Sequence, residues 1–269
     1  MSYSTLNFDI ADFVATITLH RPDAANGMNL ELAKELMQVA LRCDESPEVQ
    51  AVIITGIGKS FSVGGDLRSF ARQGADLPQH LKEVTTYLHA AVSRFTRMDA
   101  PVITAVNGVA AGAGMSLSMA CDLVIASESA RFTMAYTQAG LTPDMSSSYF
   151  LPRIVGLKRA LELTLTNRVL SAQEAYQLGI VTQVVPDAEV LTHSYDLAAQ
   201  LANEAKSALG AAKRLLHSGW NQTLETQMEN ETQTIAKMAQ SEEGIEGIAA
   251  FLEKRTPDFN RKPNVEWTR

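Results

Sequence analysis

Residues 102–116 read VITAVNGVAAGAGMS, and the rest of the chain is organised around this stretch. It opens with a β-branched run, Val102–Val106, which predicts a buried strand. Asn107 and Gly108 break that strand, small residues follow, and the pattern becomes helical from Met115. A helix that starts at a glycine-rich turn presents unpaired N–H groups and a partial positive charge. We therefore expect a strand, a tight turn and a helix whose first N–H groups can stabilise a ligand oxygen that gains negative charge.

The same stretch also fits tight packing of a helix on a sheet, because small residues serve that purpose too. Its glycine spacing does not match the G-x-G-x-x-G pattern of dinucleotide-binding folds. A second expected strand, Ala51–Thr55, leads into another glycine-rich turn, SFSVGGDL at residues 60–67. Gly64 and Gly65 free the backbone beside Val63, so the Val63 N–H can point into a cavity. Two such turns favour a pair of converging N–H donors.

The composition narrows the class of protein. The chain has 269 residues, 46% of them hydrophobic, which fits one large α/β domain or a domain with an appendage. A net charge of -7 argues against a nucleic-acid partner. Cys43 and Cys121 stand in apolar helical segments, which favours a reducing, cytoplasmic setting. We expect no secretory signal and no membrane partner, because the N-terminal residues lack the signal pattern and no apolar stretch could span a bilayer.

Strand–helix units are expected up to about Val185. The expected strands are residues 5–10, 13–19, 51–55, 102–106, 123–126, 131–134 and 181–185. Asn29 should cap a helix over residues 30–43, and Asp144 should cap a helix that runs through Leu151. We expect a mobile loop at Gln73–Gln79, followed by a helix at Leu81–Met98. The recurring strand-turn-helix pattern predicts a superhelix of similar ββα units.

The chain beyond Asp187 is expected to be helical only. The expected helices are residues 188–203, 205–218, 221–239 and 242–252. We therefore divide the chain into a core at residues 1–200 and a helical C-terminal region at residues 201–269. The tail carries apolar faces, including Trp220 and Phe251, that are too large to leave in water. These faces should pack on the core or on a partner subunit.

Several motifs together resemble the crotonase (enoyl-CoA hydratase/isomerase) superfamily over nearly the whole chain. The residues that carry the resemblance are Arg21-Pro22, 60–67, 101–114, Cys121-Asp122, 130–132, 170–175 and 251–259. The resemblance implies an α/β fold, the crotonase (ClpP-like) spiral of ββα units with an all-helical C-terminal region, assembled as trimers that often pair into hexamers. It also implies acyl-CoA thioester substrates without a metal or a separate cofactor. It places the two oxyanion N–H donors on Val63 and Ala113.

The sequence departs from the hydratases of that superfamily at two positions. Their two glutamates align with Ser116 and Tyr136, so a two-glutamate hydration mechanism looks disabled. One carboxylate, Asp144, stands where 1,2-epoxyphenylacetyl-CoA isomerase and its relatives carry a catalytic Asp. The resemblance therefore implies an isomerase that converts 3-enoyl-CoA to 2-enoyl-CoA, or performs a related ring-opening isomerisation. Asp144 would act as acid and base in a 1,3-proton shift.

Two alternatives stay open at this point. The chain is also similar to 4-chlorobenzoyl-CoA dehalogenase, in which an Asp at this place is a nucleophile assisted by a His. His89 stands at the matching distance before Pro101, but the Trp beside the Asp of that enzyme is Tyr136 here. In the isomerase interpretation His89 lines the pocket or belongs to the helix surface. The missing glutamates also allow a non-catalytic acyl-CoA-binding subunit.

The resemblance also implies residues that contact CoA. Asp23 and Ala25 would do so from one loop, and Lys254 from the tail of a neighbouring subunit would meet a CoA phosphate. The other expected contacts are Val63, Gly64, Gly65, Asp66, Leu67 and Gly112. For Lys254 the simpler alternative is the solvated end of a helix.

Overall fold

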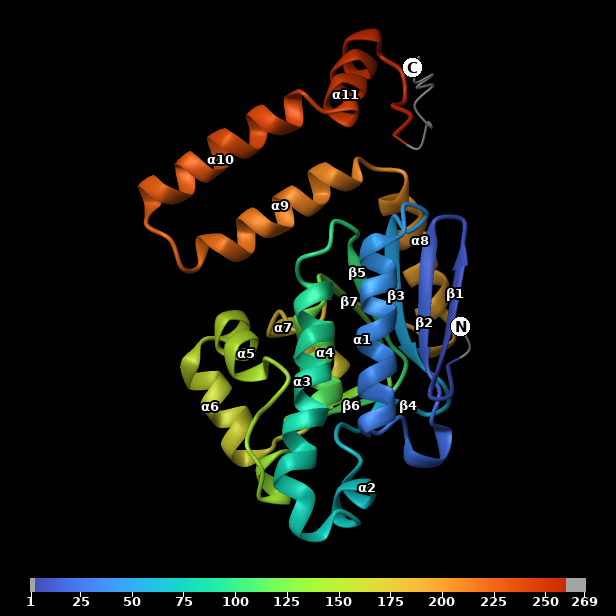
Figure 1. Ribbon diagram of the computed structural model, residues 1–269, viewed down its shortest axis with the longest axis vertical. Coiled ribbons are helices and arrows are strands. Elements are labelled where there is room, and N and C mark those ends of the chain that lie inside the picture. Colours follow the sequence, from blue (N-terminus) through green and yellow to red (C-terminus); the bar gives the residue numbers. More distant parts are fainter. Residues whose placement is uncertain (1–2, 260–269) are drawn as a thin grey trace.

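The computed structural model describes residues 3–259 and contains two sheets that the chain visits in turn (Figure 1). The first sheet has the strand order β1-β2-β3-β5-β7-β10 and the second β4-β6-β8-β9. The strands of the first sheet are β1 Leu6–Ala11, β2 Val14–Leu19, β3 Ala51–Gly56, β5 Val102–Val106, β7 Leu123–Ser127 and β10 Gln183–Val185. Those of the second are β4 Ser60–Ser62, β6 Val109–Ala111, β8 Arg131–Thr133 and β9 Leu170–Ser171.

Three strands of the first sheet, β3, β5 and β7, are each followed by a short strand of the second. Thus β3 leads to β4, β5 to β6, and β7 to β8, and each pair then leads into a helix or helical turn. Because β3, β5 and β7 are parallel neighbours, and so are β4, β6 and β8, the repeated unit advances one strand at a time in both sheets. This is the predicted spiral of ββα units. The short strand β6 lies inside the glycine-rich stretch, where the sequence pattern had predicted only a turn.

Helices cover both faces of the first sheet. On one face, α1 Leu30–Glu45 and α3 Leu77–Phe95 pack on each other, and α4 Ala113–Ala120 is buried at every position. On the other face, α8 Val190–Ala202 contacts β2, β3, β5 and β7. The remaining helices are α2 Leu67–Ala71, α5 Ser147–Val155, α6 Leu157–Thr166, α7 Ala172–Gln177, α9 Lys206–Gly219, α10 Leu224–Ala239 and α11 Glu242–Glu253. The predicted cap of α1 is confirmed, since the Asn29 side chain accepts a hydrogen bond from the Leu32 N–H.

Two local predictions are wrong. The expected mobile loop at Gln73–Gln79 contains a 3-10 turn, Gly74–Asp76, and the first turn of α3. Pro78 is compatible with that helix because it lies in the first turn, where its missing N–H has no partner to lose. Asp144 is not a helix cap, because α5 begins only at Ser147 after two left-handed residues, Met145 and Ser146.

The C-terminal helices stand apart from the spiral. Figure 1 shows α10 and α11 at the end of the molecule opposite α2, with α9 between them and the sheets. Several of their large apolar side chains are exposed, among them Leu216, Ile235 and Phe251, the last with 83% of its surface accessible. The predicted boundary at residue 200 falls within α8, and residues 1–2 and 260–269 lie outside the described part.

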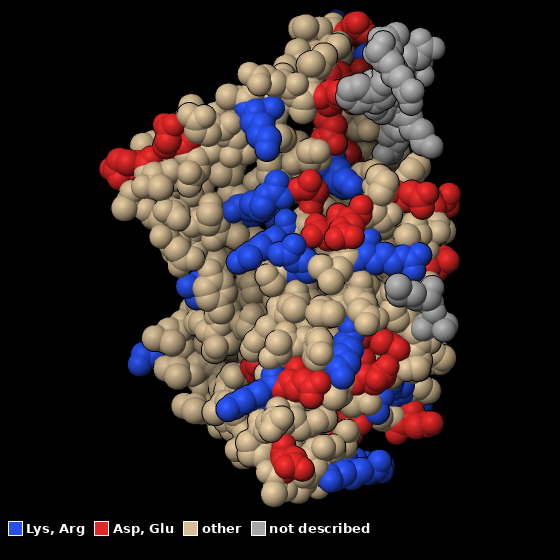
Figure 2. Space-filling model, in the orientation of Figure 1, with Lys and Arg blue, Asp and Glu red and all other residues tan. Residues whose placement is uncertain are grey.

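The charged surface carries both signs. On the face shown in Figure 2, basic and acidic side chains lie close to one another over the middle and the lower half. No helix within residues 3–259 is long and apolar enough to cross a membrane. In the same residues, no three His, Cys, Asp or Glu side chains come together in a way that could hold a metal ion.

Candidate active site

The two glycine-rich turns predicted from the sequence meet in space. Gly64 has φ +93° and Gly112 has φ +50°, both in the left-handed range that favours glycine. A Cβ added to Gly64 would lie 2.8 Å from the Ala111 carbonyl oxygen and 3.1 Å from the Ala113 nitrogen. The loop after β4 therefore touches the N-terminus of α4, and only glycine allows this approach.

The structure corrects one of the two predicted N–H donors. The Val63 N–H donates to the carbonyl oxygen of Ala25 at 3.2 Å, so it is already paired. Within residues 3–259, the N–H groups of Gly65 and Ala113 have no hydrogen-bond acceptor, and both residues line the same cavity. The pair of donors that can meet a ligand oxygen is therefore Gly65 and Ala113. The sequence pattern located the turn, but it held no signal for which N–H the Ala25 loop would take.

Gly114 sets the distance between the two turns and supports a first prediction. A Cβ at this position would lie 2.2 Å from the Ser62 carbonyl oxygen. We expect Gly114→Ala to push α4 away from β4, to cost about 1–3 kcal/mol of unfolding free energy, and to weaken acyl-CoA binding because the donor pair is distorted. Urea unfolding and titration with an acyl-CoA would measure both effects.

The matched control is Gly219→Ala, because the nearest atoms to a Cβ there lie at an ordinary 3.5 Å. Equal stability and equal binding in the two variants would show that the close approach of α4 to β4 does not shape the site.

The cavity has a volume of about 340 Å³ and lies between the turns, α3 and the loop before α5. Its walls are mainly apolar, which keeps water away and strengthens hydrogen bonds to a developing charge. The lining residues that carry a titratable side chain are Lys82, Tyr136 and Asp144. The apolar lining includes Met28, Leu67, Phe70, Leu81, Val84, Leu88 and Leu141.

The side chain of Asp144, which lines the cavity, contacts the side chain of His89, which does not. His89 Nε2 lies 2.8 Å from Asp144 Oδ1, although α3 and the loop before α5 are far apart in the sequence. The His89 side chain is 54% exposed and that of Asp144 28% exposed. The backbone carbonyl of Asp144 accepts hydrogen bonds from the Ser147 N–H at 3.1 Å and from Ser147 Oγ at 2.8 Å. Asp144 thus lines the cavity with its carboxylate tied to His89, which lies beside the cavity wall.

Ser116 and Tyr136, the two positions aligned with glutamates in the resemblance, are also in contact. Ser116 Oγ lies 2.9 Å from Tyr136 Oη, and Tyr136 Oη donates to the Asp144 backbone carbonyl at 3.2 Å. Burial raises the pKa of the Tyr136 phenol above its ordinary value. The phenol therefore stays protonated at neutral pH, and this pair of side chains brings no negative charge to the site.

The residues expected to bind CoA separate into two groups. Val63, Gly64, Gly65, Leu67 and Gly112 belong to the two turns, and all but Gly64 line the cavity. The others, Asp23, Ala25, Asp66 and Lys254, lie outside the lining.

Asp66 and Ala25 stabilise the loops around the glycine-rich turns. The Asp66 carboxylate pairs with Arg21 at 2.8 Å and accepts the Ser69 N–H at 3.0 Å. Burial opposes ionisation of Asp66, but these hydrogen bonds outweigh it and lower its pKa. Ala25 is left-handed and holds the Val63 N–H.

Asp23 and Lys254 are both exposed. Asp23 lies in a 3-10 turn, Pro22–Ala24, that precedes Ala25. Lys254 ends α11, at the opposite end of the molecule from α2 in Figure 1. A single chain therefore does not bring Lys254 to the cavity.

Comparison with known proteins agrees with this fold. The family model described as enoyl-CoA hydratase/isomerase matches residues 9–262, so the chain belongs to the enoyl-CoA hydratase/isomerase (crotonase) family and is an enzyme that acts on acyl-CoA. Among solved structures it is similar to an enoyl-CoA hydratase from Polaromonas sp. JS666, with a TM-score of 0.90 and 33% identity over 94% of this chain and 98% of that one.

Relatives whose names give different activities have similar sequence identities to this chain. The chain is 38% identical to a probable enoyl-CoA hydratase of Rhodobacter capsulatus, over 96% of this chain and 99% of that protein. It is 36% identical to 1,2-epoxyphenylacetyl-CoA isomerase of Escherichia coli, over 93% and 95%. It is 34% identical to 4-chlorobenzoyl coenzyme A dehalogenase-2 of Arthrobacter sp, over 93% and 91%. Because these names describe three different reactions, sequence identity alone does not distinguish the reaction, and the residues of the site have to do so.

Proposed function

We propose that this protein is an acyl-CoA isomerase that moves a double bond by a 1,3-proton shift, from a 3-enoyl-CoA to a 2-enoyl-CoA. The observation that carries the proposal is the presence of a single carboxylate, Asp144, among the described residues lining an apolar cavity that also holds two free N–H groups. A single carboxylate suits a reaction in which one group removes a proton and returns it elsewhere on the same substrate.

In the proposed reaction the thioester oxygen accepts hydrogen bonds from the Gly65 and Ala113 N–H groups. Asp144 removes a proton from C2, and the electron pair moves onto that oxygen to form a dienolate. Asp144 then returns the proton to C4, the C2–C3 double bond forms, and the oxygen becomes a carbonyl again. Fixed N–H donors stabilise the charged intermediate, and the thioester is the substrate, so no separate cofactor takes part.

A hydratase needs a group that activates water beside the substrate. At the two aligned glutamate positions this chain carries Ser116 and Tyr136, whose hydroxyls bond to each other rather than forming a pair of carboxylates. The name of the Escherichia coli relative, an isomerase, supports the proposal, whereas the name of the Rhodobacter capsulatus relative favours hydration. The composition of the site decides our choice between them.

We also propose that the enzyme works in the cytoplasm as a trimer or a dimer of trimers. The free buried thiols of Cys43 and Cys121 fit a reducing compartment. Exposed apolar side chains on α9 to α11, including Leu216, Ile235 and Phe251, would be covered by a neighbouring subunit. In such an assembly Lys254 of one chain would approach a CoA phosphate bound to another.

The direct test is to add the purified protein to a 3-enoyl-CoA and to follow the conjugated 2-enoyl thioester by absorbance. We expect conjugation without a change in product mass, since isomerisation adds and removes no atoms. A product heavier by one water would instead show a hydratase. Tight binding of acyl-CoA without turnover of a broad panel of thioesters would indicate a non-catalytic binding subunit.

The contact between His89 and Asp144 favours one second candidate. Asp144 could act as a nucleophile on an aromatic acyl-CoA that carries a leaving group, with His89 activating the water that later releases the product. This reaction would form a covalent adduct on Asp144 before hydrolysis. Incubation of the protein with a halobenzoyl-CoA, followed by mass spectrometry of the peptide that contains Asp144, would detect that adduct.

A further inference from the structure

A chain of hydroxyl groups links the N-terminus of α4 to Asp144. Ser116 Oγ lies 2.9 Å from the Gly112 carbonyl oxygen and 2.9 Å from Tyr136 Oη, and it can donate its one proton to either. Tyr136 Oη in turn donates to the Asp144 backbone carbonyl at 3.2 Å. This series of hydroxyl contacts therefore begins at the turn that carries the Ala113 N–H and ends at Asp144, the proposed base.

Tyr136 is the residue that connects Ser116 to Asp144 in this series of contacts. Each hydroxyl has one proton, so two protons serve the three contacts. If Ser116 donates to Gly112, Tyr136 donates either to Ser116 or to Asp144, and if Ser116 donates to Tyr136, Tyr136 donates to Asp144. When Ser116 donates to Tyr136 and Tyr136 donates to Asp144, the phenol oxygen joins α4 to the loop that carries Asp144. Its burial keeps it out of bulk water, where competing water molecules would weaken these bonds.

The backbone around Asp144 needs such support. Ala135, Met145 and Ser146 all have positive φ, at 54°, 51° and 66°, although none is glycine. Such backbone conformations are strained for residues other than glycine and persist only where the surroundings hold them. The loop between Tyr136 and Asp144 has no strand or α-helix, and its residues 137–140 are exposed. The contacts that fix its far end are the Ser147 bonds, the buried Met145 side chain and the Tyr136 phenol.

We propose that Tyr136 is a positioning residue that holds the Asp144 carboxylate at a fixed place relative to the Ala113 N–H. Its effect on turnover rests on the proposed isomerase function, but its effect on the position of Asp144 does not. A neutral phenol can do this where a glutamate could not, because a second carboxylate would repel Asp144. The replacement of both aligned glutamates thus converts a pair of charged groups into a neutral support for one base.

Tyr136→Phe tests this role because it removes only the hydroxyl. We expect kcat for the 3-enoyl-CoA to fall about 10²-fold, as misplacement of a reacting group by about 1 Å can produce, with little change in KM. We also expect a changed ¹⁵N signal of His89 Nε2 in NMR spectra, because Asp144 Oδ1 would leave its 2.8 Å contact. Ser116→Ala should have smaller effects, since Tyr136 can still donate to Asp144.

Tyr149→Phe is the matched control, because Tyr149 does not belong to the cavity lining and, among residues 3–259, its hydroxyl has a single partner, the Asn221 amide that donates to it. It should leave turnover and the His89 signal unchanged. An unchanged His89 signal in Tyr136→Phe would overturn the proposal whatever happens to kcat. Loss of acyl-CoA binding together with turnover would also overturn it, since Tyr136 would then support the fold as a whole. If the wild-type protein isomerises no 3-enoyl-CoA, the proposed function fails and the His89 signal alone decides this inference.

Discussion

Asp144→Asn should lower turnover of a 3-enoyl-CoA by about 10²–10⁴-fold, the usual contribution of a positioned acid or base. Asparagine keeps the size of the side chain and an oxygen that can accept a hydrogen bond, but it cannot take a proton from C2. The Gly65 and Ala113 N–H groups remain, so binding of an acyl-CoA should persist. Absorbance assays of conjugation measure turnover, and calorimetry measures acyl-CoA binding, so the two effects can be separated.

Asp196→Asn is a suitable control because Asp196 is exposed on α8, which covers the opposite face of the first sheet. It should match the wild type in both assays. Normal turnover in Asp144→Asn would remove Asp144 from the reaction and, with it, the proposed mechanism. A loss of acyl-CoA binding equal to the loss of turnover would mean instead that Asp144 shapes the cavity.

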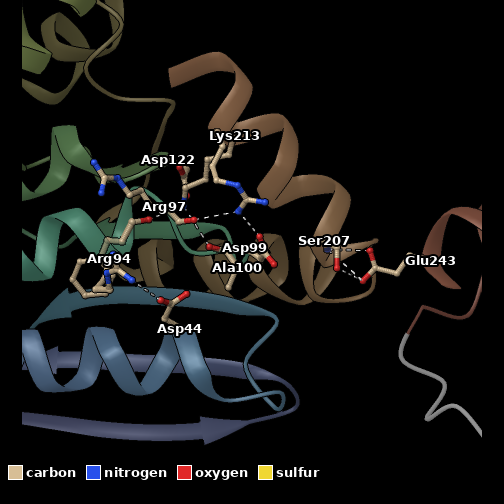
Figure 3. A network of polar contacts seen from close by, with 11 residues as sticks. Asp44, Arg94, Arg97, Asp99, Ala100, Asp122, Ser207, Lys213 and Glu243 are labelled. Carbon is tan, nitrogen blue, oxygen red and sulfur yellow. Dashed lines mark hydrogen bonds and ion pairs between the residues drawn. The ribbon is translucent and has the colours of Figure 1, made fainter. Parts of the chain in front are cut away.

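The second large effect is expected at a buried ion pair that anchors the C-terminal helices. Lys213 of α9 lies 2.7 Å from Asp122 Oδ2, and their side chains are 9% and 18% exposed. Figure 3 shows the Lys213 and Asp122 side chains next to each other. Lys213 Nζ also donates to the Phe95 carbonyl at 2.6 Å, and Asp122 Oδ2 accepts the Val102 N–H at 2.8 Å. The pair therefore ties α9 to the end of α3 and to the first residue of β5, the strand that leads into the glycine-rich turn.

Lys213→Met should lower the free energy of unfolding by about 3–5 kcal/mol, because it leaves a carboxylate buried without its partner. Burial already raises the pKa of Asp122, and the charge and hydrogen bond of Lys213 are the largest effects that oppose it, ahead of the Val102 N–H and His217. Adding Asp122→Asn to Lys213→Met should restore much of the loss, since it removes the uncompensated charge but keeps an acceptor for the Val102 N–H. Urea unfolding of the two single variants and the double variant measures the coupling.

Lys34→Met provides the comparison at the surface. Lys34 pairs with Glu83 at 3.3 Å, and both side chains are well exposed, so its loss should cost no more than about 1 kcal/mol. If Lys213→Met were as mild, or if the double variant were simply the sum of the single variants, the ion pair would not be what holds α9 on the core.

Much of the architecture could be predicted because its causes are local in the chain. The buried strand Val102–Val106 and the glycine-rich turn before α4 follow from hydrophobic pattern and glycine placement, and both are present. The helices α8 to α11 follow from apolar periodicity in the same way. Asp144 was singled out through the resemblance, because it stands where isomerases of this family carry a catalytic Asp. These signals depend on neighbouring residues, so a reading along the sequence can detect them.

The working geometry of the site was decided only by tertiary packing. The contacts between Ser116 and Tyr136, His89 and Asp144, and Lys213 and Asp122 join residues 20, 55 and 91 positions apart. The choice of Gly65 over Val63 as an N–H donor likewise depends on where the Ala25 carbonyl comes to lie. The sequence pattern was sufficient for the strands of the first sheet, the glycine-rich turns and the C-terminal helices, whereas the short strands β4, β6 and β9 form only in the packed fold. Only the packed fold decided which hydrogen-bonding groups are used up and which stay free, because that depends on distances between segments the chain does not connect directly.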